Sequence, residues 1–161
     1  MDFFPDLYRA AIEALASLPL QLLVTVGRDR DPAELGPLPA NVRVERWVPQ
    51  AELMPHVAAM VCHGGSGTVT MGLAGGVPMA VVPLFADQPW NAERVDALGA
   101  GIALDGGPEA IAGLREAVVR LTGDPGYHAT AGRIAAEMAG LPPVDAAVGI
   151  VQGLLVDRLA A

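Results

Sequence analysis

The chain has 161 residues, of which 52% are hydrophobic and only 4% aromatic, and its formal net charge at pH 7 is −8. This length predicts a single domain over residues 1–161, and the charge argues against a nucleic-acid partner, because binding a phosphate backbone needs a broad basic surface. Charges, glycines or prolines interrupt every apolar run before about 18 residues, which excludes a membrane-spanning helix, and no basic stretch with an apolar core opens the chain, so we expect a cytoplasmic location.

The hydrophobic period switches repeatedly between that of helices and that of strands. The predicted elements are, in chain order, a helix at Phe4–Leu18, a strand at Leu20–Val26, a Pro-rich loop at Asp29–Asn41, a strand at Val42–Arg46, a helical turn at Ala51–His56, a strand at Ala58–Cys62, a helix at Thr68–Ala74, a strand at Pro78–Val82, a helix at Asn91–Leu98, a strand at Gly101–Leu104, and helices at Pro108–Leu121, Tyr127–Ala139 and Val144–Leu159. This alternation predicts an α/β fold, a Rossmann-like doubly wound parallel sheet. Such a sheet normally begins with a strand, so we expect that its first strand is missing, unless the predicted number of strands is wrong.

Ligands of open parallel sheets bind beyond the carboxyl ends of the strands. Trp47, Pro49 and Gln50 follow the second predicted strand. The indole can stack on a base while the proline stiffens the turn, and the glutamine amide can contact base or ribose. The alternative is that Trp47 only plugs the end of the sheet.

A glycine-rich segment, His63-Gly64-Gly65-Ser66-Gly67-Thr68, leads from the third predicted strand directly into a helix. Glycines allow close approach of a ligand to the backbone. Ser66 or Thr68 can cap the helix, whose N–H groups and dipole form an anion site, and His63 can add a hydrogen bond or a positive charge. The alternative is a tight turn that binds nothing.

Asp87 and Gln88 follow the fourth predicted strand. They place a hydrogen-bond acceptor beside a mixed donor and acceptor, which suits a pair of sugar hydroxyls. Helix capping is the alternative for this pair. The three strand ends together predict base, phosphate and sugar subsites in a row.

These segments resemble the donor-binding, C-terminal domain of the family 1 glycosyltransferases of the GT-B fold, in particular bacterial enzymes that decorate natural products. The resemblance covers nearly the whole chain. It is carried by Trp47-Val48-Pro49-Gln50, His63-Gly64-Gly65-Ser66-Gly67-Thr68, Gly75-Gly76-Val77-Pro78, Asp87-Gln88, Asn91-Ala92 and Leu98-Gly99-Ala100-Gly101, in the same order and spacing.

The resemblance implies roles for the residues of three of these segments. Trp47 stacks on uracil or thymine, and Val48 and Gln50 contact base or ribose. His63 and the backbone of Gly65, Ser66, Gly67 and Thr68 hold the diphosphate, where His63 stabilises the leaving group. Asp87 and Gln88 hold sugar hydroxyls. The chain departs from plant members at Met71, where they carry a ribose-binding glutamate, so the ribose contacts stay open.

The implied reaction is an inverting, metal-independent transfer of a sugar, with deoxysugars favoured, from a UDP- or dTDP-sugar to a small-molecule natural product. No cofactor or metal is implied. In such enzymes an N-terminal domain binds the acceptor and supplies the general base, and this domain is absent here. The chain is therefore expected to be half of a two-domain enzyme and inactive alone. The alternative is a stand-alone module that binds nucleotide sugars without catalysis.

Four other features have simpler interpretations. Asp29-Arg30-Asp31 spells a metal-binding Asp-x-Asp but lies in a polar loop, where we expect solvated side chains. Cys62 is expected to be a buried, reduced thiol. Ser66, Asp105 and His128 follow the chain order of a serine hydrolase, a remote alternative, although Thr68 replaces the last glycine of the nucleophile elbow. An apolar stripe on the last helix is expected to lie in the core or to face a partner; it comprises Val144, Val148, Val151, Leu155 and Leu159.

Overall fold

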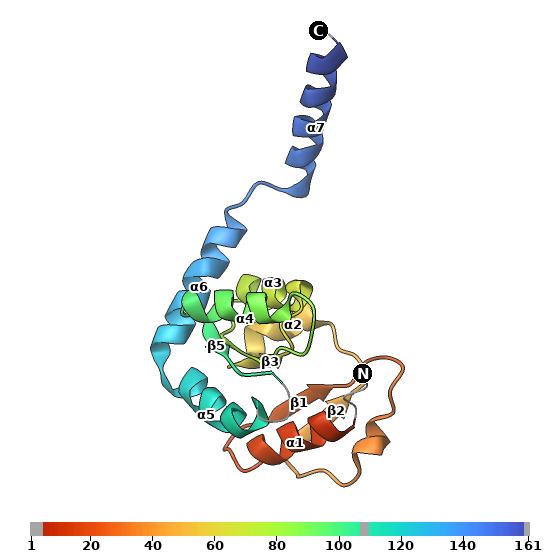
Figure 1. Cartoon of the computed structure of the whole chain (residues 1–161), viewed down its shortest axis with the longest axis vertical. Helices are drawn as coiled ribbons and strands as arrows, with labels where there is room; N and C mark the ends of the chain where they lie inside the picture. The colour runs from red at the N-terminus through yellow and green to blue at the C-terminus, as the bar shows by residue number, and fades with distance from the viewer. Residues whose placement is uncertain (1–4, 107–109, 160–161) are drawn as a thin grey trace.

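A computed structural model describes residues 5–106 and 110–159 (Figure 1). Its elements are α1 (Asp6–Leu15), β1 (Leu22–Thr25), the 3-10 turn η1 (Pro32–Leu35), β2 (Val42–Glu45), α2 (Gln50–Leu53), the 3-10 turn η2 (Met54–His56), β3 (Met60–Cys62), α3 (Ser66–Ala74), β4 (Met79–Val81), α4 (Gln88–Ala97), β5 (Gly101–Ala103), α5 (Ala110–Gly123), α6 (Pro125–Ala139) and α7 (Val144–Leu159). Strands alternate with helices and pair only in parallel among these residues, so the predicted α/β class is confirmed.

The five strands form two groups rather than one continuous sheet. β1 pairs with β2, and β3, β4 and β5 form a second sheet in that order. A doubly wound sheet that lacks its first strand has this grouping, because that strand would lie between β1 and β3. Leu23 in β1 and Val61 in β3 are each 40% exposed although both lie in the middle of a strand. The arrangement therefore agrees with the expectation of a missing first strand.

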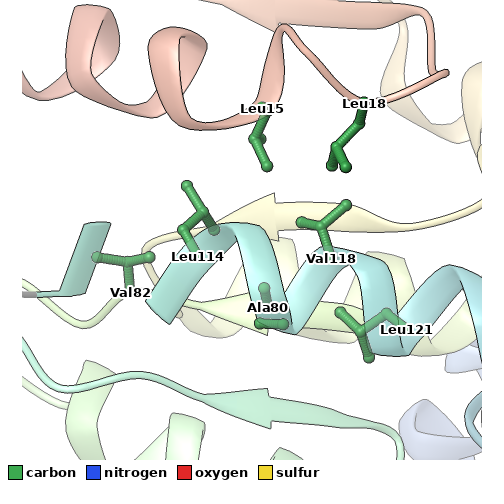
Figure 2. Packing of buried hydrophobic residues seen from close by; sticks show 8 residues of the cluster. Leu15, Leu18, Ala80, Val82, Leu114, Val118 and Leu121 are labelled. Carbon is green, nitrogen blue, oxygen red and sulfur yellow. The ribbon is translucent and has the colours of Figure 1, made fainter. Parts of the chain in front are cut away.

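The second sheet lies between two layers of helices. Alternate residues of a strand point to opposite faces, and both faces of β4 are buried. Met79 and Val81 pack with residues of α3 and α4, such as Val95. Ala80 packs on the other face with Leu114 of α5 (Figure 2). β4 is thus the centre of the core, and the loop that follows it starts from a rigid strand.

Helix α1 covers the side of the molecule where β1 and β2 lie. Ile12 and Leu15, two of the four residues predicted for its inner face, are 6% and 7% exposed. Ile12 packs with Val26 and Leu35, and Leu15 joins the core formed by α5 and β4 (Figure 2). The other two predicted residues, Leu7 and Ala11, are half-buried, so the predicted face is confirmed with its strongest burial at the C-terminal end of the helix.

The C-terminal helices leave the sheets. α6 packs against α3, and α7 extends beyond it, away from both sheets (Figure 1). Val148 and Val151 are 52% and 56% exposed, so the prediction that the apolar stripe of α7 lies in the core is wrong for these two residues. The side chains of Val144, Leu155 and Leu159 lie outside the described residues. None of the helices in the described part of the chain combines the length and hydrophobicity that a membrane crossing requires.

Candidate functional site

The loop between β3 and α3 has a backbone that only glycine fits at its second position. Gly64 is buried and has φ +87°. A Cβ atom there would lie 2.7 Å from Val81 Cγ1 and 3.1 Å from the carbonyl oxygen of Gln88. Because neither the left-handed φ nor these contacts tolerate a side chain, the loop is held tightly against β4 and the start of α4.

Helix α3 begins with unsatisfied backbone donors that point out of the loop. The helix starts at Ser66, and its N-cap residue Gly65 provides no side-chain hydrogen bond. The predictions that the helix starts at Thr68 and that Ser66 or Thr68 caps it are therefore wrong. The first N–H groups of a helix have no partner within it, and together with the helix dipole they favour an anion. The N-terminus of α3 thus offers the amides of Ser66, Gly67 and Thr68 to a ligand.

The imidazole of His63 lies over this helix start. A Cβ atom built on Gly65 would be 2.6 Å from His63 Nε2, so the ring occupies the space that a side chain at position 65 would need. His63 is exposed. The ring nitrogen and the amides of α3 are therefore available to the same group, as the sequence predicts for the diphosphate.

The loop between β4 and α4 is organised by Gln88. This side chain is 3% exposed, and its Oε1 accepts hydrogen bonds from the backbone N–H groups of Leu84 at 2.8 Å and Phe85 at 3.0 Å. Ala86, which lies between Phe85 and Gln88, has φ +56°, a left-handed conformation that costs an L-residue about 1–2 kcal/mol. Gln88 can therefore make its predicted contact with a sugar only through Nε2, because Oε1 already accepts two hydrogen bonds from the loop.

Asp87 stands next to the strained Ala86 and is exposed. It occupies the N-cap position of α4, but its side chain makes no capping hydrogen bond, so helix capping does not explain it. Asn91 Nδ2 donates to Asp87 Oδ2 at 3.0 Å and to the carbonyl oxygen of Gly64 at 2.8 Å. The structure thus brings the second and third predicted motifs together. The sequence alone gave Asn91 no role in the site.

Trp47 lies in the loop after β2, at the end of the other sheet. Its side chain is 54% exposed, so it does not plug the sheet as the alternative interpretation held. The Arg28 guanidinium lies 4.4 Å from the centroid of its ring. Together with Pro32, Glu45 and Arg46 these two residues line an open hollow of about 470 Å³.

The other residues predicted for the base and ribose lie directly after Trp47. Val48 is half-buried, and Gln50 is the first residue of α2. No hydrogen bond in the described part of the chain joins Trp47 to the loops of His63 or Asp87. Its membership of the same site therefore stays a prediction.

Two competing interpretations of the sequence lose support. Asp31 is the N-cap of η1: its side chain accepts from the Ala33 N–H, and the Glu34 side chain reaches back to the Asp31 N–H. This confirms the Asp29-Arg30-Asp31 segment as an ordinary polar loop. Ser66 is the first helical residue and has no positive φ, whereas a hydrolase nucleophile occupies a strained turn.

Cys62 is a free thiol directly before His63. Burial raises the pKa of this thiol to about 11, and a backbone hydrogen bond with Gly64 opposes part of this effect. Because the thiolate is the reactive form, we expect iodoacetamide to alkylate Cys62 of the folded protein at least about tenfold more slowly than that of the urea-unfolded protein near pH 8. Mass spectrometry of timed samples measures both rates. Equal rates would contradict the burial of this sulfur.

Comparison with known proteins identifies the family. The model of the erythromycin biosynthesis protein CIII-like C-terminal domain matches residues 9–154. The chain belongs to this family. The chain is 39% identical over 145 residues to the 4'-demethylrebeccamycin synthase of Lentzea aerocolonigenes, a match that covers 90% of the chain and 34% of that protein. This CIII-like domain thus spans about a third of the length of the curated relative.

Solved structures agree with this assignment of the CIII-like domain. The calicheamicin glycosyltransferase CalG4 matches with a TM-score of 0.86 and 34% identity, covering 100% of this chain and 42% of that chain. The glycosyltransferase VinC in complex with dTDP matches with a TM-score of 0.77 and 33% identity, covering 88% of this chain and 35% of that chain. The predicted resemblance to the C-terminal domains of natural-product glycosyltransferases is confirmed.

Proposed function

We propose that the chain is the donor-binding half of a metal-independent, inverting glycosyltransferase, which moves a sugar from a UDP- or dTDP-sugar to a small-molecule natural product. The observation that carries this proposal is the geometry of the loop before α3. The start of α3 has no side-chain cap and lies beneath the imidazole of His63, and Asn91 hydrogen-bonds both to Gly64 in this loop and to Asp87. The acceptor and the general base would belong to a second domain.

The proposed chemistry follows from where charge develops. As the glycosidic bond of the donor breaks, negative charge builds on the leaving diphosphate. Oriented main-chain amides and an imidazole stabilise such charge because they are fixed before the reaction. The N–H groups of Ser66, Gly67 and Thr68 together with His63 supply these donors without a metal ion, and Asp87 would hold a sugar hydroxyl beside them.

The nucleotide preference tests this function. We expect calorimetry to show that the chain binds UDP or dTDP more tightly than GDP or ADP, because the family resemblance implies a subsite for uracil or thymine at Trp47. The relative solved with dTDP favours dTDP as the better ligand. Equal affinity for all four nucleotides would argue against the proposed base subsite. Binding without any transfer in a protein that carries both domains would favour the alternative of nucleotide-sugar binding without catalysis.

Trp47→Ala is expected to lower the affinity for dTDP or UDP by about tenfold. Stacking on an aromatic ring contributes about 1–3 kcal/mol per base, and the exposed position of Trp47, with Arg28 already over the ring, favours the lower half of this range. Isothermal titration calorimetry of both proteins measures the change.

Trp90→Ala is the matched control. Trp90 is 60% exposed and carries Arg94 over its ring at 5.2 Å, so it repeats the chemistry of Trp47 at another place. We expect its removal to leave the nucleotide affinity within about twofold of the unchanged protein. An equal loss in both variants would indicate a general effect of removing an exposed indole rather than a base subsite at Trp47.

A further inference from the structure

We propose that Asn91 is a positioning residue that locks the Asp87 carboxylate to the loop before α3, so that sugar and diphosphate are held at a fixed separation. This inference rests on the proposed function, because it assumes that Asp87 contacts the sugar. Asn91 lies one helical turn after Asp87 on α4, and 27 residues separate it from Gly64. Among the described residues, it is the only side chain that hydrogen-bonds to both loops.

The chemistry of the two contacts fixes which end of the Asn91 amide faces them. The carbonyl oxygen of Gly64 can only accept, and so can the ionised carboxylate of Asp87. The NH₂ group of Asn91 must therefore point at both, at 2.8 Å and 3.0 Å, and each of its two hydrogens has one partner. No other neutral side chain of this length offers two hydrogens on one atom.

The parts that Asn91 connects are themselves rigid. Gly64 has a left-handed backbone and no room for a side chain beside Val81, and Gln88 holds the loop that contains the left-handed Ala86. The Asp87 side chain, in contrast, is exposed and has no capping bond. The hydrogen bond from Asn91 to Oδ2 therefore restrains this exposed side chain between the two loops, and it leaves Oδ1 open to a ligand.

Two variants of Asn91 test this role in the whole chain, with dTDP and dTDP-glucose as probes. Asn91→Ala removes the link, and Asn91→Asp keeps the shape but places a third acceptor against two others. We expect dTDP-glucose to bind about tenfold more weakly to either variant, while dTDP stays within about threefold of its original affinity. A purely structural role would change the affinity for both probes by the same factor, and this result would overturn the proposal.

Asn41→Ala is the matched control. Asn41 Nδ2 also donates to two carbonyl oxygens, those of Ala16 at 3.0 Å and Leu20 at 2.9 Å, and it is also half-buried. Losing this bridge also removes two hydrogen bonds of one side-chain amide, at the start of β2, the opposite end of that strand from Trp47. We expect the ratio of the two affinities to stay unchanged in Asn41→Ala, whatever the change in melting temperature.

Asp87→Ala separates a failure of the inference from a failure of the proposed function. We expect Asp87→Ala to bind dTDP-glucose more weakly. Adding Asn91→Ala to Asp87→Ala is expected to cause no further loss of affinity, because the two residues act as one unit. If Asp87→Ala binds dTDP-glucose normally, the proposed sugar subsite is wrong. If Asp87→Ala weakens binding but both Asn91 variants do not, the subsite stands and the positioning role of Asn91 is wrong.

Discussion

Ser66→Pro is expected to weaken the binding of dTDP or UDP by about 30-fold while the fold stays intact. Proline lacks the N–H group that Ser66 offers at the first position of α3, where proline is otherwise well tolerated. The preceding Gly65 has φ −60° and ψ 137°, the extended conformation that a residue before proline prefers. Calorimetry measures the affinity, and thermal unfolding is expected to show an equal or higher melting temperature, because proline also restricts the unfolded chain.

Ser66→Ala distinguishes the contribution of the backbone N–H group to nucleotide affinity from that of the side-chain hydroxyl. This variant keeps the N–H group and removes only the exposed side-chain oxygen, so its affinity is expected to stay within about threefold of the unchanged protein. If Ser66→Pro bound nucleotide as tightly as Ser66→Ala, the diphosphate would not lie at the start of α3, and the anion site would have to be sought elsewhere.

The glycine-rich loop was predictable because its signal is local. Three glycines beside His63 at the end of an apolar segment indicate a close turn into a helix, and the structure has this turn. The exact cap was not predictable, because Gly65, Ser66 and Thr68 are all acceptable N-cap residues. The structure selects Gly65, so that the helix begins at Ser66.

The roles of Gln88 and Asn91 could not be predicted in the same way. Sequence spacing shows that Asp87 and Gln88 follow a strand, but not that Gln88 turns inward to satisfy two amides of its own loop. The contact of Asn91 with Gly64 joins two segments that neighbouring strands bring together, and the stacking of Arg28 on Trp47 likewise joins two neighbouring strands. Such contacts depend on strand pairing, which hydrophobic periodicity does not specify.

Periodicity also fails to show what covers an apolar face. The stripe on α7 has the spacing of a core helix, yet Val148 and Val151 are exposed. In β1 and β3 the apolar side chains of Leu23 and Val61 are exposed for a related reason: the strands were predicted at their correct places, but their sheet is split into two groups. Local patterns thus predicted the elements, whereas burial depends on neighbours.

His63→Ala is expected to lower the affinity for dTDP or UDP by about 100-fold, the largest effect of the substitutions considered. A charge-assisted hydrogen bond to a phosphate is stronger than a neutral one, and the exposed ring of His63 is the side chain that lies over the start of α3. Calorimetry with dTDP and UDP measures this loss, and circular dichroism checks that the variant remains folded.

A comparison of thymidine with dTDP distinguishes the loss of a phosphate contact from a general loss of structure. Thymidine has the base and the sugar but no phosphate, so its weaker binding, followed by NMR titration, is expected to change by no more than about twofold in His63→Ala. His56→Ala removes another exposed histidine, at the end of η2, and is expected to leave both ligands unaffected. If His63→Ala weakened thymidine and dTDP by the same factor, the imidazole would support the fold of the loop rather than the diphosphate, and the stabilisation of the leaving group would rest on the amides of α3 alone.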